Sequence, residues 1–591
     1  MGSMISSRDA ARRRTLFVIR EIARMSPDSI TDILALDADD AVEILDAVPV
    51  RLAAAACFIR LRTDHCAADD IFAALLDNIR STTVTSRRGE ISPADHNQNF
   101  GIKVLASSSE LAQIVGPSFV PHLVDDEHEI ARELRNATAL IHEIWPSILV
   151  MAEATIDFCI GLAGPRGDTR AFSDRDVPGL VAFSVNNPPA LLAEQLIYEA
   201  TSLALGLRIE DHESLQETLS RMPGCYSPFT EAACTAETVL HEATSYGCVL
   251  KFWQLLHQRK CLDPSWLDYE DESLMRRIVA GRVSELTERV ALGWKSLVCV
   301  SQESEASDFS AIYEEFVGDH PPSGHDTDDQ NTIGAMFAPI HRAELVLAMD
   351  GQKVSRFSIG IRSIPILTAL LKSGIPHCYS LQAFASKPDP KLAGFANAFS
   401  ASCHISNAGS EHEVLCYVAK ERADARQACD MDADDAAGDA FGIPPCCQAF
   451  FRRHWAATRE SGGDLFSLLM KKNPGTDAVK VPWQCNAAAM YGGAGLCWHF
   501  PCSFECEATV DAINRRQSAL ARLDKSLGEF LSSEQKRAFL WSRAGGYGFL
   551  PFERMSDAKC CDVRWTGIPP LPAHEPALAA TEVGWRLVVP R

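Results

Sequence analysis

The chain has 591 residues, a formal net charge of −22 and 20 cysteines. This length predicts about three to five domain-sized units. Apolar residues make up 47% of the chain and charged residues 23%, a balance that excludes wholesale disorder. The excess of 78 acidic over 56 basic residues argues against non-specific binding to nucleic acids or anionic membranes, because both need a positive field, although it leaves room for a local basic groove.

The sequence contains no uninterrupted apolar stretch of about 18 residues, so we expect no transmembrane helix. The apolar run at residues 16–19 is short, and Arg20 and Glu21 interrupt it. We therefore expect a cytoplasmic protein whose cysteines are thiols or metal ligands rather than disulfides. Twelve of the 20 cysteines lie between Cys378 and Cys561, and this asymmetry is the first indication of a functional site.

Helical patterns dominate the first two regions of the chain. Residues 5–85 carry apolar side chains at three- and four-residue spacing, which predicts a helical N-terminal region. A second, mainly helical region spans residues 102–300. Within it we expect helices at 127–144, 189–207, 233–258 and 272–297 and one short strand at 180–185. The acidic residues 301–332, rich in Pro, Gly and Ser, predict a linker.

The third region, residues 333–591, mixes strand and helix patterns and ends in a Pro-rich tail. We expect strands at 343–349, 414–419 and 583–589 and helices at 365–372 and 448–457. The predicted fold class is therefore a multi-domain protein. Mainly α-helical N-terminal and middle regions precede a Cys-rich C-terminal domain of the α+β or α/β class.

Two helical segments of the middle region, residues 196–202 and 239–245, share the sequence Glu-Ala-Thr-Ser. A helical H-E-x-x-H motif places two imidazoles one turn apart, where both can bind one metal ion. Neither segment has both histidines. Tyr198 and Ser202 occupy the two ligand positions of the first segment, and the second segment has only His241.

Together with the segments 226–229 and 252–253, these residues resemble the H-E-x-x-H peptide-modification family over about residues 105–300. Members of that family are associated with ribosomal peptide natural products, and some are regarded as α-ketoglutarate-type peptide β-hydroxylases. The resemblance implies a degenerate site in which only Glu199 and His241 remain of the metal-binding residues.

One imidazole and one carboxylate hold a hard divalent metal weakly. We therefore expect the middle domain to bind a substrate or a partner through residues that include Glu199 and His241. Two alternatives stay open. One is a metal site rebuilt from Glu199, His241 and further ligands, and the other is helical packing alone, with His241 as a core histidine.

The C-terminal region carries a stronger pattern. Cys446 and Cys447 follow a proline pair and start an apolar-periodic helix. The N-terminus of a helix stabilises anions, so it favours a thiolate, the form that binds metals or attacks electrophiles. About 50 residues further on, His499, Cys502 and Cys506 form an H-x-x-C-x-x-x-C run.

If a helix starts directly after Cys502, Cys502 and Cys506 lie on one face of it. With Cys446, Cys447 and His499 they form a soft ligand set for zinc or iron, the iron being mononuclear or in an iron–sulfur cluster. The spacing matches neither a double C-x-x-C zinc site nor a ferredoxin, so the metal stays open. Two alternatives are a metal-free thiol site, with Cys446 or Cys447 as the nucleophile near His499, and ordinary buried thiols.

Both motifs resemble a family known as domain of unknown function 483, over about residues 340–555. The family pattern G-[YI]-P-x-C-C followed by H-F-P-C-S-x-x-C falls on residues 442–447 and 499–506. This resemblance implies a Cys/His site with specific motifs, but it brings no established reaction.

These patterns predict a metal-dependent biosynthetic enzyme that modifies a peptide or an amino-acid-derived substrate, with an oxidoreductase as one form if the metal is iron. Cys446, Cys447 and His499 are its candidate catalytic residues, and the degenerate middle domain binds the substrate or a partner biosynthetic protein. The alternative is a non-catalytic, zinc-stabilised protein that holds a peptide for a separate enzyme. The charge disfavours a third class, modification of a nucleic acid.

Overall fold

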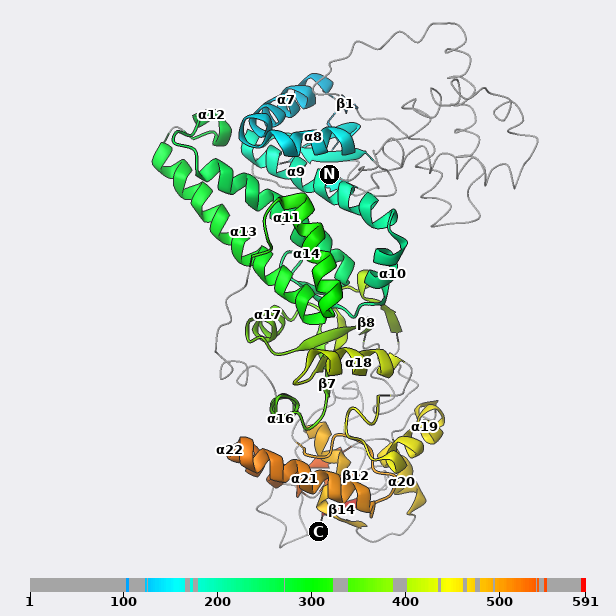
Figure 1. The fold of residues 1–591 in the computed structure, drawn as a ribbon. Helices are drawn as coiled ribbons and strands as arrows, with labels where there is room; N and C mark the ends of the chain where they lie inside the picture. The colour runs from blue at the N-terminus through cyan, green and yellow to red at the C-terminus, as the bar shows by residue number, and fades with distance from the viewer. Residues whose placement is uncertain are drawn as a thin grey trace, which may run out of the picture. The chain divides into compact units, whose positions relative to one another are not determined.

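A computed structural model describes the chain in the following ranges: 102–105, 123–124, 126–164, 171–173, 179–269, 271–322, 339–385, 401–433, 437–460, 465–473, 479–492, 495–537, 539–541, 547–549 and 586–590 (Figure 1). The helical region expected at 5–85 lies outside these residues. The chain divides into two compact units. Unit 1 runs to Leu219 and adds 240–291 and 307–322, and unit 2 comprises 220–239, 292–306 and the chain from Ser323.

Unit 1 contains a four-stranded sheet that the helical patterns did not predict. Its strands are β1 (Lys103–Val104), β2 (Phe158–Leu162), β3 (Ala171–Ser173) and β4 (Leu180–Ser184), in the order β1-β2-β4-β3. β1, β2 and β4 are parallel, and β3 is antiparallel to β4. β2 and β4 are buried along their whole length, so they form short apolar runs without alternation. The middle region is therefore mainly helical, as predicted, and it also contains this small sheet.

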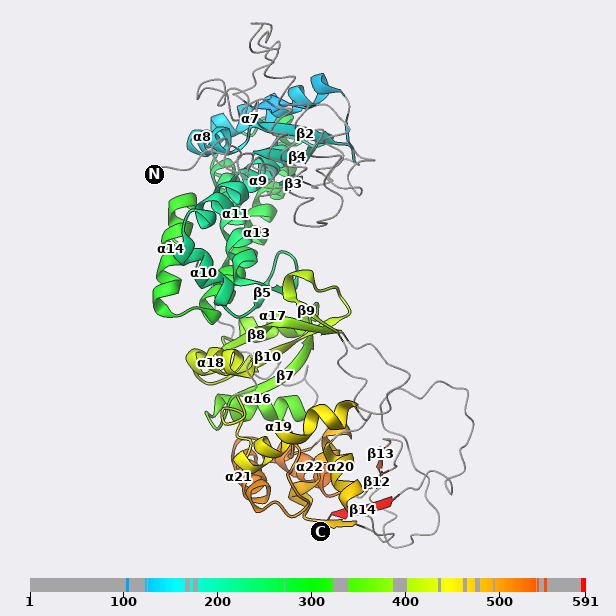
Figure 2. The same cartoon turned by 90° about the vertical axis from the view of Figure 1, so that its right-hand side faces the viewer.

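Three helices lie near this sheet, as Figure 2 shows. They are α7 (Glu127–Ile144), α8 (Pro146–Thr155) and α9 (Pro189–Glu210). α9 packs against β3 and β4 and against both other helices. The expected helices at 127–144 and 189–207 and the expected strand at 180–185 are confirmed.

α9 and α11 (Ala236–His257) run antiparallel to each other in unit 1. The indole N–H of Trp253 donates a 2.7 Å hydrogen bond to Glu194, and the rings of Tyr198 and Tyr246 lie 4.7 Å apart. Later residues of α9 therefore lie beside earlier residues of α11. Further helices of the two units are α10 (Glu213–Arg221), α12 (Pro264–Leu267) and α13 (Glu272–Val300).

The predicted linker at 301–332 is wrong over its first half, where α14 (Glu303–Val317) forms. Its acidic side chains alternate with a buried stripe of Phe309, Ile312, Tyr313 and Val317. These four apolar residues have helical spacing, but most residues of the segment are polar, so the pattern was not recognised as a helix. The rest of the expected linker, from residue 323, lies outside the described residues.

Unit 2 is built on an antiparallel sheet with the order β7-β10-β8-β9. The strands are β7 (Ser355–Gly360), β8 (His377–Ala385), β9 (Ala401–His404) and β10 (His412–Val418). Two helices of the same unit, α17 (Ile364–Lys372) and α18 (Arg422–Ala433), lie beside this sheet. The expected helix at 365–372 and the expected strand at 414–419 are confirmed.

The strand predicted at 343–349 is wrong, because these residues belong to helix α16 (Pro339–Met349). Ala343, Leu345, Leu347 and Ala348 are all buried, so the helix is apolar around most of its circumference. A short run of that kind has no clear period, and a strand gives the same pattern.

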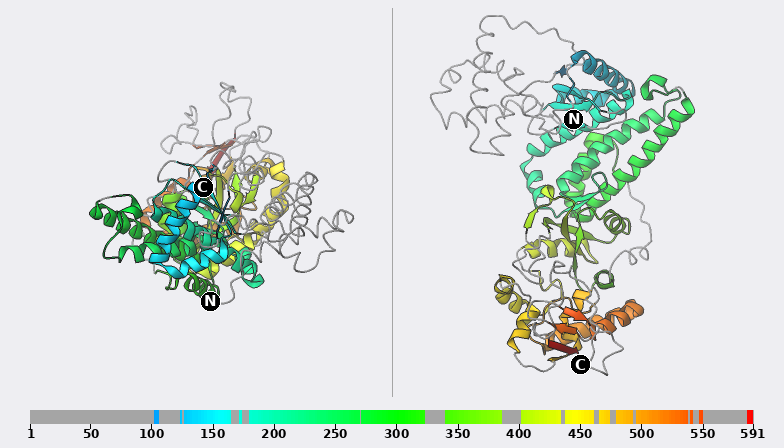
Figure 3. Two further views of the ribbon diagram at one scale, coloured as in Figure 1. Left: turned by 90° about the horizontal axis from the view of Figure 1, so that it is seen from above. Right: turned by 180° about the vertical axis from the view of Figure 1, so that it is seen from behind.

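The remaining helices of unit 2 are α19 (Pro445–Glu460), α20 (Leu465–Lys472), α21 (Glu507–Leu523) and α22 (Lys525–Gln535). α21 and α22, coloured orange in Figures 1 and 3, pack against each other and against α16. A small sheet has the order β11-β14-β12-β13, from Val479–Val481, Arg586–Pro590, Phe539–Trp541 and Tyr547–Phe549. The expected helix at 448–457 and the expected C-terminal strand are thus confirmed. Within the described ranges, no helix has both the length and the apolarity needed to cross a membrane.

Candidate metal centre

Cys446 and Cys447 lie in the first turn of α19, as the sequence predicts. Pro445 occupies the first helical position, where a missing N–H costs nothing and the fixed φ angle suits the helix. The preceding Gly442 has a φ of 69°, the left-handed conformation that favours glycine, and this turn directs the chain into the helix. Both sulfurs therefore belong to the positive end of α19.

Cys502 and Cys506 come together through a turn and not along a helix. α21 begins at Glu507 with Cys506 as its N-cap, so the helix expected to start directly after Cys502 is wrong in that position. The backbone N–H of Cys506 donates to the carbonyl of Ser503 (3.3 Å), and the Cys506 carbonyl accepts from Val510 (3.0 Å). The turn ends where the helix begins, and it leaves the Cys506 side chain at the helix N-terminus.

The four sulfurs of Cys446, Cys447, Cys502 and Cys506 lie within 4.8 Å of one another. The sulfur of Cys506 is 3.7 Å from that of Cys446 and 3.6 Å from that of Cys447, and the sulfurs of Cys446 and Cys447 are 3.9 Å apart. A tetrahedral ion with metal–sulfur bonds of about 2.3 Å has ligand–ligand edges of about 3.8 Å. The cluster therefore matches the dimensions of a site for a single ion, of which zinc and iron are examples.

The electrostatics of the cluster favour negative charge. Two helix N-termini, those of α19 and α21, meet at the four sulfurs. Burial raises the pKa of Cys447 and, together with its neighbouring thiols, raises the pKa of Cys502 to about 12. Burial also opposes ionisation of Cys506, but hydrogen bonds with Thr509, Cys502 and Cys447 outweigh it and lower the pKa of Cys506 to about 7. Of Cys447, Cys502 and Cys506, Cys506 is thus the one that ionises at the lowest pH.

His499 lies beside the cluster rather than within it. Its Nε2 is 3.1 Å from the hydroxyl oxygen of Thr509, which is 3.3 Å from the sulfur of Cys447. The group of four possible ligands does not include His499. The imidazole therefore reaches the cluster through Thr509, and four cysteines fill a tetrahedron without it.

The sequence did not reveal two residues that contribute to this region. Thr509 is fully buried between Cys447 and His499, and its only signal is its position three residues after an N-cap, where helix-capping contacts form. Cys485 is also buried, and its thiol donates to the Cys506 carbonyl (3.8 Å). Burial raises the pKa of Cys485 to about 12, so it packs as a neutral thiol.

The cluster is open to solvent on one side. Cys446 is exposed and Cys502 is partly exposed, whereas Cys447 and Cys506 are buried. A complete set of four thiolates closes the coordination of a tetrahedral ion, the usual arrangement of a structural site. Cys446, as the exposed ligand, is the position where an external group has access.

The structure does not bring Glu199 and His241 together. His241 lies opposite Gly206, with its Cε1 3.6 Å from the position of a Cβ on that glycine, whereas Glu199 is seven residues earlier on α9. Seven residues are about two turns, or about 10 Å along the axis. In the described part of the chain, only the four cysteines form a group of three or more close His, Cys, Asp or Glu ligands.

Glu199 has a polar partner of its own. The hydroxyl of Ser173, on β3, donates a hydrogen bond to its carboxylate. Burial raises the pKa of Glu199 to about 7, so the carboxyl group holds a proton over much of the acidic range. The contact between β3 and α9 accounts for Glu199 without a metal.

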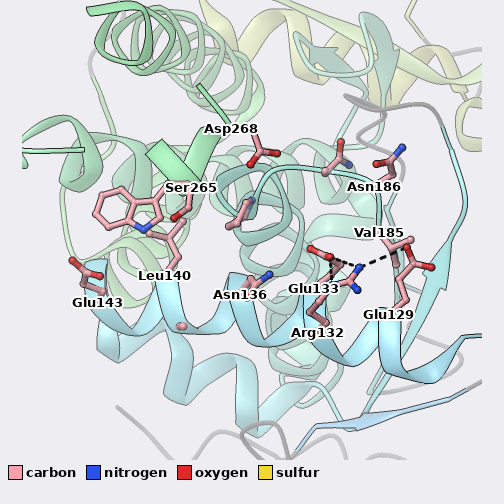
Figure 4. Close-up of a pocket in the computed structure, with 14 residues that line it drawn as sticks. Glu129, Arg132, Glu133, Asn136, Leu140, Glu143, Val185, Asn186, Ser265 and Asp268 are labelled. Atoms are coloured by element: carbon pink, nitrogen blue, oxygen red, sulfur yellow. Dashed lines mark hydrogen bonds and ion pairs between the residues drawn. The ribbon is translucent and has the colours of Figure 1, made fainter. Parts of the chain in front are cut away.

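A groove of about 620 Å³ lies along α7 in unit 1, and no sequence motif predicted it (Figure 4). α7 forms one wall, and the β4–α9 connection and α12 form the others. Four carboxylates line it, from Glu129, Glu133, Glu143 and Asp268, together with Arg132, amide and hydroxyl groups and Trp266. Arg132 pairs with Glu133 (2.9 Å) and Glu129 (3.8 Å), so the groove keeps a net negative charge.

Comparison of the chain with protein-family models gives no match, and comparison with curated proteins gives no significant match. Membership of the two families that the motifs resemble is therefore a hypothesis, and the proposed function rests on the geometry of the residues.

Proposed function

We propose that Cys446, Cys447, Cys502 and Cys506 hold a single zinc or iron ion, and that this centre serves a biosynthetic enzyme that modifies a peptide or an amino-acid-derived substrate. The observation that supports the metal is the spacing of the four sulfurs, 3.6–3.9 Å for the three measured pairs. In an iron–sulfur cluster the four thiolates are divided among two or more iron atoms, so sulfurs on different irons stand further apart. The compact group favours one ion.

The chain's own residues supply the setting for the chemistry. Two helix N-termini favour the anionic thiolates, and the buried side of the cluster excludes water from Cys447 and Cys506. Because four thiolates leave no open coordination position, bound iron would supply electron transfer, and bound zinc would hold the exposed Cys446 as a thiolate nucleophile. The exposed sulfur of Cys446 is the position at which a substrate meets the centre.

The groove along α7 supports the proposal that the substrate is a peptide. The residues from Glu129 to Glu143 extend over about 21 Å of helix, the length of about six residues of an extended peptide. Side-chain amides along the groove, such as those of Asn136 and Asn186, can pair with a peptide backbone. The excess of carboxylates favours a segment that carries lysine or arginine.

A second candidate function is a non-catalytic protein that holds a peptide for a separate enzyme. The observation that favours it is the set of four thiolates, since structural zinc sites are closed in this way. In that case the metal stabilises unit 2, and a modified peptide appears only when the partner enzyme is present.

Metal analysis of the full chain, purified without oxygen, tests the centre directly. We expect about one zinc or iron ion per chain in wild type and in Cys261→Ala, a control at an exposed cysteine of unit 1, and none in Cys502→Ala/Cys506→Ala. Incubation with peptides encoded beside the gene, read as mass shifts, tests the reaction. Wild-type protein without metal, or full activity of the double variant, would contradict the proposal.

A further inference from the structure

We propose that Thr509 and His499 form a hydrogen-bond relay onto the sulfur of Cys447 and act as positioning residues of the metal centre. This inference rests on the proposed metal site and assigns a role to two side chains outside the four cysteines. The residues concerned all belong to unit 2 and connect α19, α21 and the segment before Cys502.

The geometry fixes the direction of the relay. The hydroxyl of Thr509 lies between the Cys447 sulfur at 3.3 Å and the His499 Nε2 at 3.1 Å. A hydroxyl has one hydrogen to donate, and a metal-bound thiolate can only accept. The Thr509 hydrogen therefore goes to the thiolates of the cluster, to Cys447 at 3.3 Å and with Cys506 as a second acceptor. The Thr509 oxygen accepts from an N–H at Nε2 of His499.

This direction assigns the tautomer of His499. With its hydrogen at Nε2, the neutral imidazole has a lone pair at Nδ1. His499 is 6% exposed, and its Nδ1 has no hydrogen-bond partner among the described residues. Burial, together with the positive charges of Lys353 and Arg516, lowers the pKa of His499 to about 3. The ring is thus neutral, as the relay requires.

The positive charges near His499 are themselves held in place. The Nζ of Lys353 lies 3.8 Å from the centre of the Trp498 ring, directly before His499 in sequence. Glu344 pairs with both Lys353 and Arg516, which fixes the two cations in the core. A lone pair at Nδ1 is favoured beside positive charge, whereas a second N–H there is not.

A hydrogen bond to a metal-bound thiolate withdraws electron density from the sulfur and fixes its orientation. Thr509 is fully buried, and with the hydrogen at Nε2 His499 donates to the hydroxyl and cannot accept its hydrogen. We therefore expect the hydrogen bond from Thr509 to increase the affinity for the metal. We also expect the metal–sulfur bond of Cys447 to differ spectroscopically from that of a sulfur that accepts no such hydrogen bond.

The test uses the full chain with cobalt(II) in place of the native metal. Thr509→Val removes the hydroxyl with little change in shape, so we expect the sulfur-to-cobalt charge-transfer band to move to longer wavelength. Zinc affinity should fall about 10-fold, the size usual for outer-shell partners of metal ligands. Thr509→Ser should restore both quantities. Ser518→Ala removes an exposed hydroxyl from the same helix and should change neither.

His499 gives a second pair of variants should Thr509→Val fail to fold. His499→Phe removes the donor at Nε2 and should shift the band in the same direction, whereas His499→Gln, which retains an N–H, should shift it less. An unchanged band and affinity in Thr509→Val, or in His499→Phe, overturns the relay while the metal site stands. Wild-type protein that binds neither cobalt nor zinc overturns the metal site and the relay together.

Discussion

Glu344 and Arg516 form an ion pair in the core of unit 2, with 5% and 6% of their side chains exposed. Lys353 joins the same carboxylate at 2.5 Å, so one buried anion holds two buried cations. The pairing lowers the pKa of Glu344 to about 2 against the opposing effect of burial. A carboxylate in this position stabilises the fold because its removal leaves both cations without compensation.

Glu344→Gln should therefore destabilise unit 2 by about 3–5 kcal/mol, the usual cost of breaking a buried pair from one side. Denaturant unfolding at neutral pH measures the loss. Glu529→Gln is the matched control, since Glu529 forms an exposed pair with Lys525 and its loss should cost less than about 0.5 kcal/mol. Equal effects of the two substitutions would contradict the role assigned to Glu344.

Metal removal should also destabilise unit 2. The four cysteines join the start of α19 to the start of α21, which are about 60 residues apart in sequence, and a bound ion closes that loop. Treatment with a strong chelator should lower the unfolding temperature by about 5 °C or more and release thiols that react with Ellman's reagent.

Cys502→Ser should show the same lower unfolding temperature without chelator, and chelator should then have no further effect on it. Cys403→Ser, at a partly buried cysteine on β9, should retain the chelator response of wild type. A wild-type unfolding temperature that does not respond to chelator would argue against a metal-stabilised cluster.

The sequence predicted the parts of this site that local chemistry determines. Proline before Cys446 marks a helix start, and a helix start favours a thiolate, so Cys446 and Cys447 were identifiable. Ligand chemistry, and not sequence spacing, predicts that Cys446 and Cys447 lie close to Cys502 and Cys506. The turn that joins Cys502 to Cys506 is not predicted by the sequence. Thr509 carries no motif, because its role depends on neighbours that are distant in sequence.

Fold prediction failed at two short apolar segments, although the strand at 180–184, which is of the same kind, was predicted. Residues 343–349 form a helix and 158–162 form a strand, although both are short apolar runs without a clear period. The longer helices were predicted, because their length makes the helical period clear: α7 with both of its ends, and α9, α11 and α13 to within three residues at each end.

The groove in unit 1 should bind peptides with a positive charge more tightly than matched neutral peptides. Glu133→Gln/Glu143→Gln removes two of its four carboxylates, so affinity for a lysine-containing hexapeptide should fall about 3- to 10-fold. Added salt should weaken binding to wild type more than to the variant. Fluorescence anisotropy of a labelled peptide measures both effects.

Glu153→Gln is the control for the groove, because Glu153 is exposed on α8 and does not line it. It should leave peptide affinity unchanged. Equal binding of lysine-containing and neutral peptides to wild type would contradict the proposal that the carboxylates of this groove favour a positively charged peptide.

Glu199 offers a test that separates a structural carboxyl group from a metal ligand. Its pKa rises from 4.5 to about 7 on burial, so between these values the folded state holds a proton that the unfolded state releases. This contribution to stability is fully present below pH 4.5 and is lost as the pH rises through 7. At pH 8 the buried carboxylate costs about 3 kcal/mol relative to a neutral group.

Glu199→Gln keeps an oxygen that can accept from Ser173 and removes the charge, so it should stabilise unit 1 at pH 8 by up to about 3 kcal/mol. Near pH 4.5 the variant and wild type should unfold alike, and Glu153→Gln should show no such pH-dependent difference. Unfolding temperatures across this pH range give the measurement. A variant less stable than wild type at pH 8 would show that the folded protein uses the ionised carboxylate, as a ligand or substrate anchor at this position would.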